Sequence, residues 1–224
     1  AIVDLRDCML VPHGGTSGVT VNQPSMIHAG GNLTVDIHDV EWIGNLAGAI
    51  GSSHQYDSVQ FIYAPSGLKG RIGECSIATR WATTCKPQIV GGSATDPFTT
   101  SSYGTPLTIR DSKFEYWNNT SGSPTDHKHA ASIHLYMDRD ITDASDDYNF
   151  EGLRISGNSF MQQPSAAPTN WLEDAPAILI EARNGGAGSS GWAVTDNFIA
   201  YGIGVQYIDG TGGATSAHHG PAII

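Results

Sequence analysis

The segment Leu153-Arg-Ile-Ser-Gly-Asn-Ser-Phe160 contains a six-residue phrase that decides how this chain of 224 residues folds. The phrase begins at Ile155. Its first and sixth positions are apolar, its third is acidic or Gly, its fourth is small or polar, and its second and fifth are variable. Because the same phrase returns along the chain, the sequence indicates a repeat architecture. The six copies begin at Leu5, Ile37, Ile72, Ile109, Ile155 and Val194.

Each copy predicts two short strands joined by a sharp corner. Five copies also carry an apolar residue two positions before the first, whereas the third copy has Gly70 there. Such alternation is typical of a strand with one buried face. The third position is Asp, Glu or Gly, and these residues favour a sharp bend, because Asp bonds its local backbone and Gly tolerates positive φ.

A second apolar run follows most copies, as in Ile133-His-Leu135 and Ile178-Leu-Ile180, and the copies are spaced 32, 35, 37, 46 and 39 residues apart. Short strands with loops of unequal length predict an all-β fold: a right-handed parallel β-helix, a solenoid of about six irregular rungs with long loop insertions. We expect one domain over residues 1–224. An irregular antiparallel sandwich is the alternative, whereas leucine-rich and propeller repeat patterns are absent.

Aligning the copies predicts which residues stack at about 4.8 Å per rung. We expect the fourth position to face inward and its last two members, both Asn, to form a side-chain ladder. In this column Cys8 and Cys75 would lie two rungs apart, at a distance of roughly 9 to 10 Å, which is too far for a disulfide. Cys75 and Cys85 either close a short loop or are free thiols. The column is Cys8, Val40, Cys75, Ser112, Asn158 and Asn197.

The composition limits the classes of partner. A net charge of −11 opposes binding to nucleic acid and to anionic membranes. No apolar stretch approaches the roughly 20 residues that cross a bilayer, so we expect no membrane insertion. Asp outnumbers Glu 16 to 6, which fits either the many turns of a solenoid or a high-salt protein. Both ends stop in mid-pattern, which suggests a segment of a longer chain or ends covered by partner chains.

Phrases such as Leu153-Arg-Ile-Ser-Gly-Asn-Ser-Phe160 and Trp192-Ala-Val-Thr-Asp-Asn-Phe198 resemble those of the pectate-lyase-like right-handed β-helix superfamily. The resemblance extends from residue 3 to about 208 and is one of repeat style, closest to the spike and surface proteins of tailed viruses. The superfamily also includes polysaccharide lyases and glycoside hydrolases. The catalytic sets of pectate lyases and polygalacturonases have no residue-by-residue match in this chain.

One candidate site lies on the second strands. Their alignment stacks Tyr136 with Glu181 and Gln206, flanked by Asp138 and Arg183. A carboxylate pair about 5 to 10 Å apart is what glycoside hydrolysis requires, so Glu181 and Asp138 are candidate catalytic residues. The other three are candidate sugar-binding residues. The alternative is a surface ladder with an ion pair of little energetic worth.

Two further groups are candidates for binding. Tyr116, Trp117 and Trp171 could form a carbohydrate platform, or they could pack loops onto the solenoid. Asp143, Asp146 and Asp147 belong to a run of five Asp that could supply oxygen ligands to Ca²⁺, or be a solvated acidic loop. We predict no other cofactor.

Three functions remain open. The leading hypothesis is a virion-surface or spike-type structural β-helix, homotrimeric, that recognises a host-surface polysaccharide or glycoprotein from an extracellular or virion-surface location. The second is a polysaccharide-degrading hydrolase or lyase, acting through Glu181 and Asp138. The third is a purely structural capsid decoration or surface-layer module.

Overall fold

The computed structural model describes twelve segments of the chain. These are residues 1–10, 25–44, 58–64, 67–79, 86–93, 107–117, 131–138, 152–163, 177–183, 193–200, 204–209 and 217–219. Within them the secondary structure consists of β-strands, and no helix occurs. The all-β prediction is therefore confirmed for the described part of the chain.

The strands form two sheets, of ten and seven strands. Sheet A contains β1 (Ile2–Leu10), β3 (Leu33–Gly44), β5 (Leu68–Gly73), β6 (Ser76–Thr79), β8 (Thr108–Arg110), β9 (Lys113–Trp117), β11 (Arg154–Ser156), β12 (Ser159–Gln163), β14 (Ala193–Thr195) and β15 (Phe198–Ile199). Sheet B contains β2 (Ser25–His28), β4 (Ser58–Ala64), β7 (Lys86–Ser93), β10 (Ile133–Asp138), β13 (Ile178–Arg183), β16 (Val205–Asp209) and β17 (Ala217–His219).

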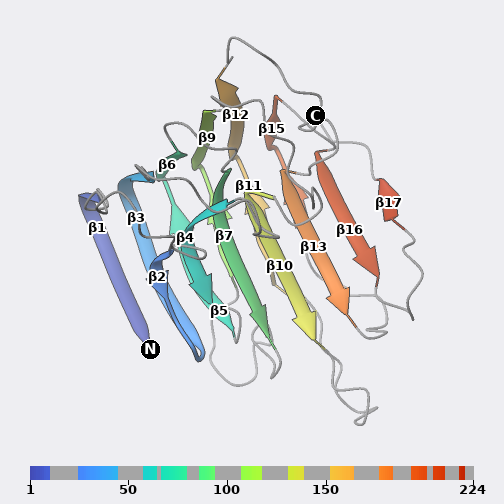
Figure 1. Ribbon diagram of the computed structural model, residues 1–224, viewed down its shortest axis with the longest axis horizontal. Helices are drawn as coiled ribbons and strands as arrows, with labels where there is room; N and C mark the ends of the chain where they lie inside the picture. Colours follow the sequence, from blue (N-terminus) through green and yellow to red (C-terminus); the bar gives the residue numbers. More distant parts are fainter. Residues whose placement is uncertain are drawn as a thin grey trace, which may run out of the picture.

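Strand pairing is parallel in both sheets, except that β16 pairs antiparallel with β17. The antiparallel sandwich alternative is therefore wrong. In sheet B the order β2, β4, β7, β10, β13, β16 follows the chain (Figure 1). From β2 to β16, successive strands of sheet B are separated along the chain by strands of sheet A, so successive repeats lie side by side in sequence order.

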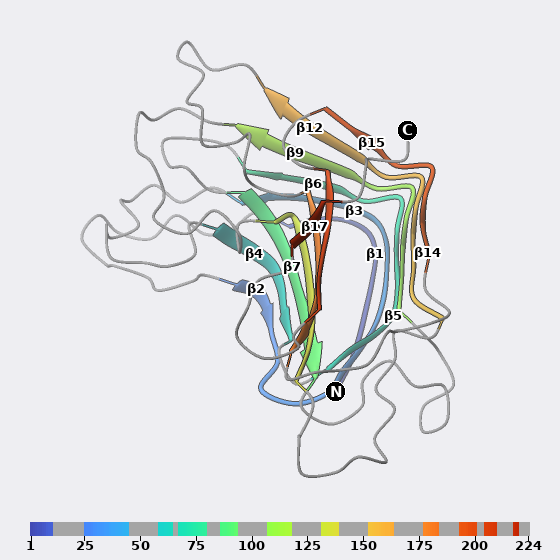
Figure 2. The same ribbon diagram turned by 90° about the vertical axis from the view of Figure 1, so that its right-hand side faces the viewer.

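Sheet A is bent into two arms (Figure 2). The first arm holds β5, β8, β11, β14 and the residues of β1 and β3 before the bend. The second arm holds β6, β9, β12, β15 and the residues of β1 and β3 after it. Both arms therefore belong to one repeated strand, corner, strand unit, as the six-residue phrase predicts.

The corner lies at the third position of every copy, and its residue always has positive φ. The five acidic residues and one Gly have φ between 48° and 68°. Non-Gly residues seldom adopt this left-handed conformation, but Asp does so more readily than most. The predicted corner is therefore confirmed in each copy. The residues are Asp7, Asp39, Glu74, Asp111, Gly157 and Asp196.

The core is built from columns of residues paired across neighbouring strands. The first position of the phrase contributes Leu5, Ile37, Ile72, Ile109, Ile155 and Val194. The sixth contributes Leu10, Trp42, Ile77, Phe114, Phe160 and Ile199. The central four members of each column are buried. Stacking of the Phe114 and Phe160 rings, with centroids 4.9 Å apart, fixes the spacing of two repeats.

The fourth position faces the same interior, as predicted. Val40, Cys75, Ser112, Asn158 and Asn197 are buried, and Cys8 is half-buried. Cys8 and Cys75 are free thiols, which agrees with the predicted register. The Cys75 thiol donates to the Gly73 carbonyl at 3.1 Å. Cys85 lies outside the described residues.

Sheet B supplies the opposite wall of the core through alternate residues. Ile133, Leu135, Ile178 and Ile180 are fully buried and belong to the same core cluster as the columns of sheet A. The predicted second runs lie in β4, β7, β10 and β13. In the first repeat the strand of sheet B is Ser25–His28, which the sequence pattern missed.

Candidate ligand-binding face

The first arm of sheet A presents a polar outer surface. Its inner residues are buried and its outer residues alternate with them, as in β8 and β11, where exposed or half-buried residues flank a buried Ile. We call this surface the polar face. In the two outward columns it carries Asp4, Arg6, Asp36, His38, Arg71, Thr108, Arg110, Arg154, Ser156 and Thr195.

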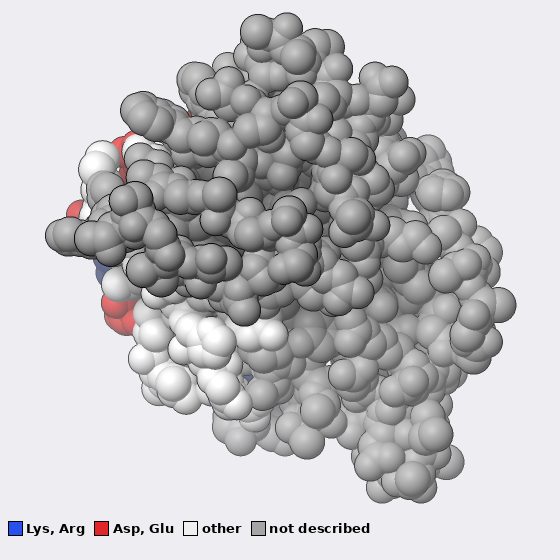
Figure 3. Space-filling view, viewed as in Figure 1, with Lys and Arg blue, Asp and Glu red and all other residues white. Residues whose placement is uncertain are grey.

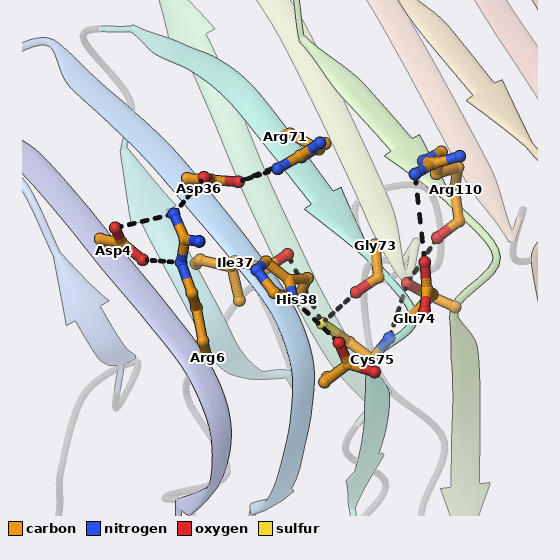
Figure 4. A network of polar contacts seen from close by, with 12 residues as sticks. Asp4, Arg6, Asp36, Ile37, His38, Arg71, Gly73, Glu74, Cys75 and Arg110 are labelled. Atoms are coloured by element: carbon orange, nitrogen blue, oxygen red, sulfur yellow. Dashed lines mark hydrogen bonds and ion pairs between the residues drawn. The ribbon is translucent and has the colours of Figure 1, made fainter.

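Four side chains at one end of the polar face form a continuous chain of ion pairs (Figure 4). Arg6 Nε donates to Asp4 Oδ1 at 2.7 Å, and Arg6 Nη2 reaches Asp36 Oδ2 at 2.9 Å. Arg71 then donates to Asp36 Oδ1 through Nη2 at 2.9 Å and through Nε at 3.1 Å. Each exposed pair adds only about 0–1 kcal/mol, so the main effect of the chain of pairs is to hold the guanidinium groups in place.

These contacts shift the pKa values of the two residues at the end of the chain of pairs. The hydrogen bond from Arg6 lowers the pKa of the Asp4 carboxyl below its ordinary value. The same bond, from the other side, raises the pKa of Arg6. Both groups therefore stay charged at neutral pH, and the ion pair persists.

At the other end of the polar face, the ion pairs of Arg110 are longer. Arg110 lies 3.6 Å from Asp111 and 4.0 Å from Glu74, which are long distances for ion pairs. Arg154 Nη1 donates to the Leu153 carbonyl at 2.8 Å. The strand register places Thr108 between Arg71 and Arg154.

The corner residues form a row of carboxylates beside the polar face. Asp7, Asp39, Glu74, Asp111 and Asp196 are all exposed. His38 Nδ1 lies 2.8 Å from the Asp39 carboxylate. In the view of Figure 3 most of the visible charged atoms lie along the left-hand edge, where β1 and β3 lie in Figure 1.

The site predicted on the second strands is only partly described. The register pairs Tyr136 with Glu181, and Asp138 with Arg183, across β10 and β13. Both pairings agree with the sequence alignment. The side chains of these four residues lie outside the described part, so the predicted catalytic pair and its sugar-binding neighbours stay a prediction.

The placement of Gln206 in that site is wrong. Gln206 lies opposite Leu179, and Ile208 is the residue opposite Glu181. The predicted alignment places Gln206 at the level of Glu181, but Gly204 has φ 82° and its carbonyl accepts from the N–H groups of Ala177 and Ile178. The strand therefore starts at Val205, and Gln206 is displaced by two residues from the predicted position.

The face of sheet B that carries Tyr136 and Glu181 is covered at the adjacent level. His134 and Leu179 lie on this side of the sheet, opposite the core, and are 5% and 0% exposed.

The remaining candidates receive limited structural information. Tyr116 and Trp117 lie in β9, where their backbones pair with Gln162 and Gln163, and their side chains are not described. Trp171, Asp143, Asp146 and Asp147 lie outside the described residues. Among described residues no group of three or more His, Cys, Asp or Glu could hold a metal ion, and no helix is suited to span a membrane.

Sequence reasoning missed the polar face. A signal was present, because the residues that flank the apolar first position read Asp4 and Arg6 in the first copy and Asp36 and His38 in the second. Alternate residues of a strand share one face, so these pairs could have been placed together.

A comparison of the chain with protein-family models, curated proteins and solved structures finds no match.

Proposed function

We propose that the chain is a right-handed parallel β-helix, a structural protein of a virion surface or spike, that recognises a host-surface polysaccharide or glycoprotein. The strand order supports the solenoid, because each repeat adds one strand to sheet B and one strand pair to sheet A. The right hand follows from the strong preference of parallel crossover connections. The proposed location is the virion surface or another extracellular site.

The observation that carries recognition is the polar face. Its guanidinium and carboxylate groups lie on strands whose opposite faces pack in the core. The ion pairs of Asp36 with Arg6 and Arg71 hold these groups in position before any ligand arrives. Preorganised hydrogen-bonding groups lose little entropy on binding. Sugars are recognised through such polar groups, and a long regular surface suits a repeating glycan.

We propose a homotrimer, as in the virus spikes that the repeat style resembles. Three parallel shafts would place three copies of the polar face on one particle, and simultaneous binding raises the avidity without a new contact. Weak single sites would then suffice for attachment to a cell surface.

Two measurements test this function together. Glycan-array binding of the purified chain, with neutral and acidic surface polysaccharides, is expected to show a restricted set of ligands. Sedimentation velocity on the same preparation is expected to give the mass of a trimer. A monomer that binds no glycan at any tested concentration would contradict the proposal.

A polysaccharide-degrading activity is the second candidate, and one observation favours it. The register brings Glu181 beside Tyr136, with Asp138 two residues further along the neighbouring strand. Carboxylates on adjacent strands can reach the separation that glycosidases use. A purely structural capsid or surface-layer role has no such specific observation in its favour.

The enzyme hypothesis has a direct test. Release of reducing ends or unsaturated products from a panel of surface polysaccharides is measured for the wild type, Glu181→Gln and Asp138→Asn. Turnover that both variants abolish, with unchanged unfolding midpoints, would support the site. Turnover that neither variant alters would remove this site assignment.

A further inference from the structure

We propose that two copies of this chain associate end to end, by antiparallel pairing of their β1 strands across a two-fold axis near Leu5. In this arrangement Asp4 of each copy lies opposite Arg6 of the other. The association uses one end of the two sheets and is independent of glycan recognition, so it goes beyond the proposed function.

The outer edge of β1 offers backbone groups for a further strand. β1 is the last strand of sheet A at the left of Figure 1, where it pairs with β3. The Thr34 N–H donates to the Ala1 carbonyl at 2.9 Å, so Ala1 turns its backbone towards β3. Because this direction alternates along a strand, Leu5 also faces β3, and Asp4 and Arg6 present their N–H and C=O groups to the outer edge. Such an edge is a template for another strand.

The apolar core is incompletely covered at this end. Apolar residues of the first repeat that pack against the core are only partly buried, whereas their counterparts in the next repeat are buried. The partly buried residues are Val3, Leu5, Cys8, Leu10, Met26, Ile27 and Ala29. Ile2 and Met9, also in β1, are 82% and 58% exposed. A second copy against this end would remove apolar area from water, which favours association.

The two faces of β1 decide the orientation of the second copy. A two-fold axis perpendicular to sheet A makes the paired strands antiparallel and keeps the core-facing residues of both copies on the same side. A two-fold axis along the strands would make them parallel and place Leu5 of one copy on the polar side of the other. The antiparallel arrangement therefore joins the two apolar faces, and it is a closed contact of the commonest symmetry.

Charge selects the register of this pairing. When Leu5 lies opposite Leu5 of the second copy, each Asp4 faces an Arg6 on the outer side of the sheet. A shift of two residues in one direction places Asp4 opposite Asp4, and the reverse shift places Arg6 opposite Arg6. Like charges directly opposite one another destabilise a sheet, whereas opposite charges stabilise it. A shift of one residue would turn the faces of the two strands to opposite sides.

Arg6 has donors for a second carboxylate. Its Nε and Nη2 atoms donate to Asp4 and Asp36 of the same chain at 2.7 to 3.0 Å. A guanidinium carries five N–H groups, so the two N–H groups of Nη1 lie outside these three bonds. The side chains of Arg6 and Asp4 are 49% and 55% exposed. The existing ion pairs can therefore persist while Nη1 donates to Asp4 of the second copy.

The net charge of −11 on each copy opposes association at long range. At physiological ionic strength the Debye length is about 8 Å, so most of this repulsion is screened. Side chains opposite one another on adjacent strands lie closer than that, with Cβ atoms about 5 Å apart. The local pairing of Asp4 with Arg6 is therefore screened less than the overall repulsion.

The opposite end of the sheets does not favour head-to-tail stacking. There β17 pairs antiparallel with β16 and occupies the place where β2 of a following copy would pair. At the β1 end, the described part of the chain holds no such antiparallel strand. The two-fold contact between β1 strands is therefore the favoured association.

Sedimentation equilibrium of the full chain tests the association. We expect the mass to double as the chain concentration rises from about 1 to about 100 µM, as for a dissociation constant in the micromolar range. The doubling is from monomer to dimer, or from trimer to hexamer where the shafts also associate side by side.

Two charge variants test the pairing of Asp4 with Arg6. Asp4→Arg brings two positive charges together across the two-fold axis, and Arg6→Asp brings two negative charges together. Each variant alone is expected to associate at least roughly tenfold more weakly than the wild type. An equimolar mixture of the two variants restores opposite charges at both positions and should associate within about threefold of the wild type.

The control separates the local pair from a general charge effect. Arg110→Asp makes the same change as Arg6→Asp on β8, in the middle of sheet A, and should leave association within about twofold of the wild type. Asp4→Arg makes the net charge less negative, so a general charge effect would strengthen association where the pairing predicts weakening. Urea midpoints confirm that each variant is folded.

A crosslink tests the register. Leu5 would lie opposite Leu5 in a pair without hydrogen bonds between the two copies, where Cα atoms are about 4.5 Å apart, within the range of a disulfide. Leu5→Cys is therefore expected to form a disulfide-linked dimer when oxidised with copper phenanthroline. Val3→Cys, whose opposite residue would be Asp7, is the control and should not. Peptide mass mapping distinguishes this bond from bonds of the native Cys8.

The outcomes separate this inference from the proposed function. A mass that stays constant over the concentration range would overturn it, and so would unchanged doubling in both charge variants or a mixture no better than either variant alone. Crosslinking through Val3→Cys in place of Leu5→Cys would overturn the register. A trimer that binds glycans and never doubles would leave the proposed function standing, whereas doubling without glycan binding would contradict the proposed function alone.

Discussion

Asn158 Nδ2 donates to Asn197 Oδ1 at 2.9 Å, so two side chains 39 residues apart in the sequence join successive repeats inside the core. The same Asn197 oxygen accepts from the Asn158 backbone N–H at 3.0 Å. Asn158 Oδ1 in turn accepts from the Ser112 N–H, and the Ser112 hydroxyl accepts from the Cys75 N–H. The ladder thus provides acceptors for backbone N–H groups at the corner that have no partner in the parallel strand pairing.

Asn158→Ala is expected to destabilise the chain by about 2–4 kcal/mol. The substitution removes the partners of the Ser112 N–H and the Ile109 carbonyl, both of which stay buried, and each unsatisfied buried group costs about 1–3 kcal/mol. Urea unfolding measures the change. Ser156→Ala, on the half-buried outer face of the same repeat, is the control and should change stability by less than about 0.5 kcal/mol. Equal effects of the two substitutions would contradict the ladder.

Phe160→Ala is expected to cost about 3–5 kcal/mol, as for other large core truncations. Phe160 is fully buried and its ring lies at 9° to the ring of Phe114. Phe198→Ala is the control, because it makes the same chemical change at a side chain that is 57% exposed. That variant should unfold within about 1 kcal/mol of the wild type. A small loss for Phe160→Ala would mean that the sixth column is not core.

Gly157→Ala tests the corner. An added Cβ would clash with Asp111 Oδ1, and φ is +68°, so we expect a loss of about 1–3 kcal/mol. Asp111→Gly removes the carboxylate, and in that background the steric part of the cost should disappear. Gly31→Ala, where an added Cβ meets nothing within 4 Å, is the control. In thermal unfolding, Gly157→Ala should therefore lower the stability less in the Asp111→Gly background than in the wild type. An equal loss in both backgrounds would assign the whole cost to the positive φ.

The sequence predicted the repeats of sheet A in detail, because each column must satisfy the same constraint six times. The corner at Asp39 or Gly157 needs a residue that tolerates positive φ, and the core beside it needs an apolar first and sixth position. These requirements recur in every copy, so the repeated pattern is visible in one sequence without an alignment. The inward Asn column was predictable for the same reason, since Asn158 and Asn197 occupy equivalent positions.

The register of sheet B and the polar face were harder to predict. The strand at Val205 follows a single glycine with positive φ, and nothing in the run Ile203-Gly-Val205 distinguishes a glycine inside a strand from one that starts it. The polar face depends on which outward residues of distant repeats become neighbours. Asp36 and Arg71 differ in type at equivalent positions, as do Arg6 and His38, so the contacts follow from the register and not from a repeated motif.

The thiol of Cys75 is expected to be protected. Burial raises its pKa above the ordinary value of 9.0, and both low exposure and lack of thiolate slow alkylation. Because the unfolded thiol ionises first, stability is unaffected below pH 9 and falls as pH rises above it towards the folded pKa. Iodoacetamide labelling followed by peptide mass mapping should modify Cys8 before Cys75 in native protein, and both alike in urea. Equal native rates would contradict the burial.

The pairing of Asp4 with Arg6 has a pH signature. A depressed folded pKa means that the carboxylate contributes stability above its unfolded pKa, and that this contribution is lost as pH falls through the folded pKa. Nuclear magnetic resonance titration of the Asp4 carboxyl should therefore give a midpoint below 3.8 in the wild type. Arg6→Gln should raise that midpoint towards 3.8, because the hydrogen bond that lowers it is removed. Arg110→Gln, on the other end of the polar face, should leave it unchanged. Suppose that Arg110→Gln moved the midpoint as much as Arg6→Gln. The combined electrostatic field of the nearby charges, and not the bond from Arg6, would then lower the pKa of Asp4. The ion pair of Asp4 with Arg6, which begins the chain of ion pairs through Asp36 to Arg71, would be contradicted.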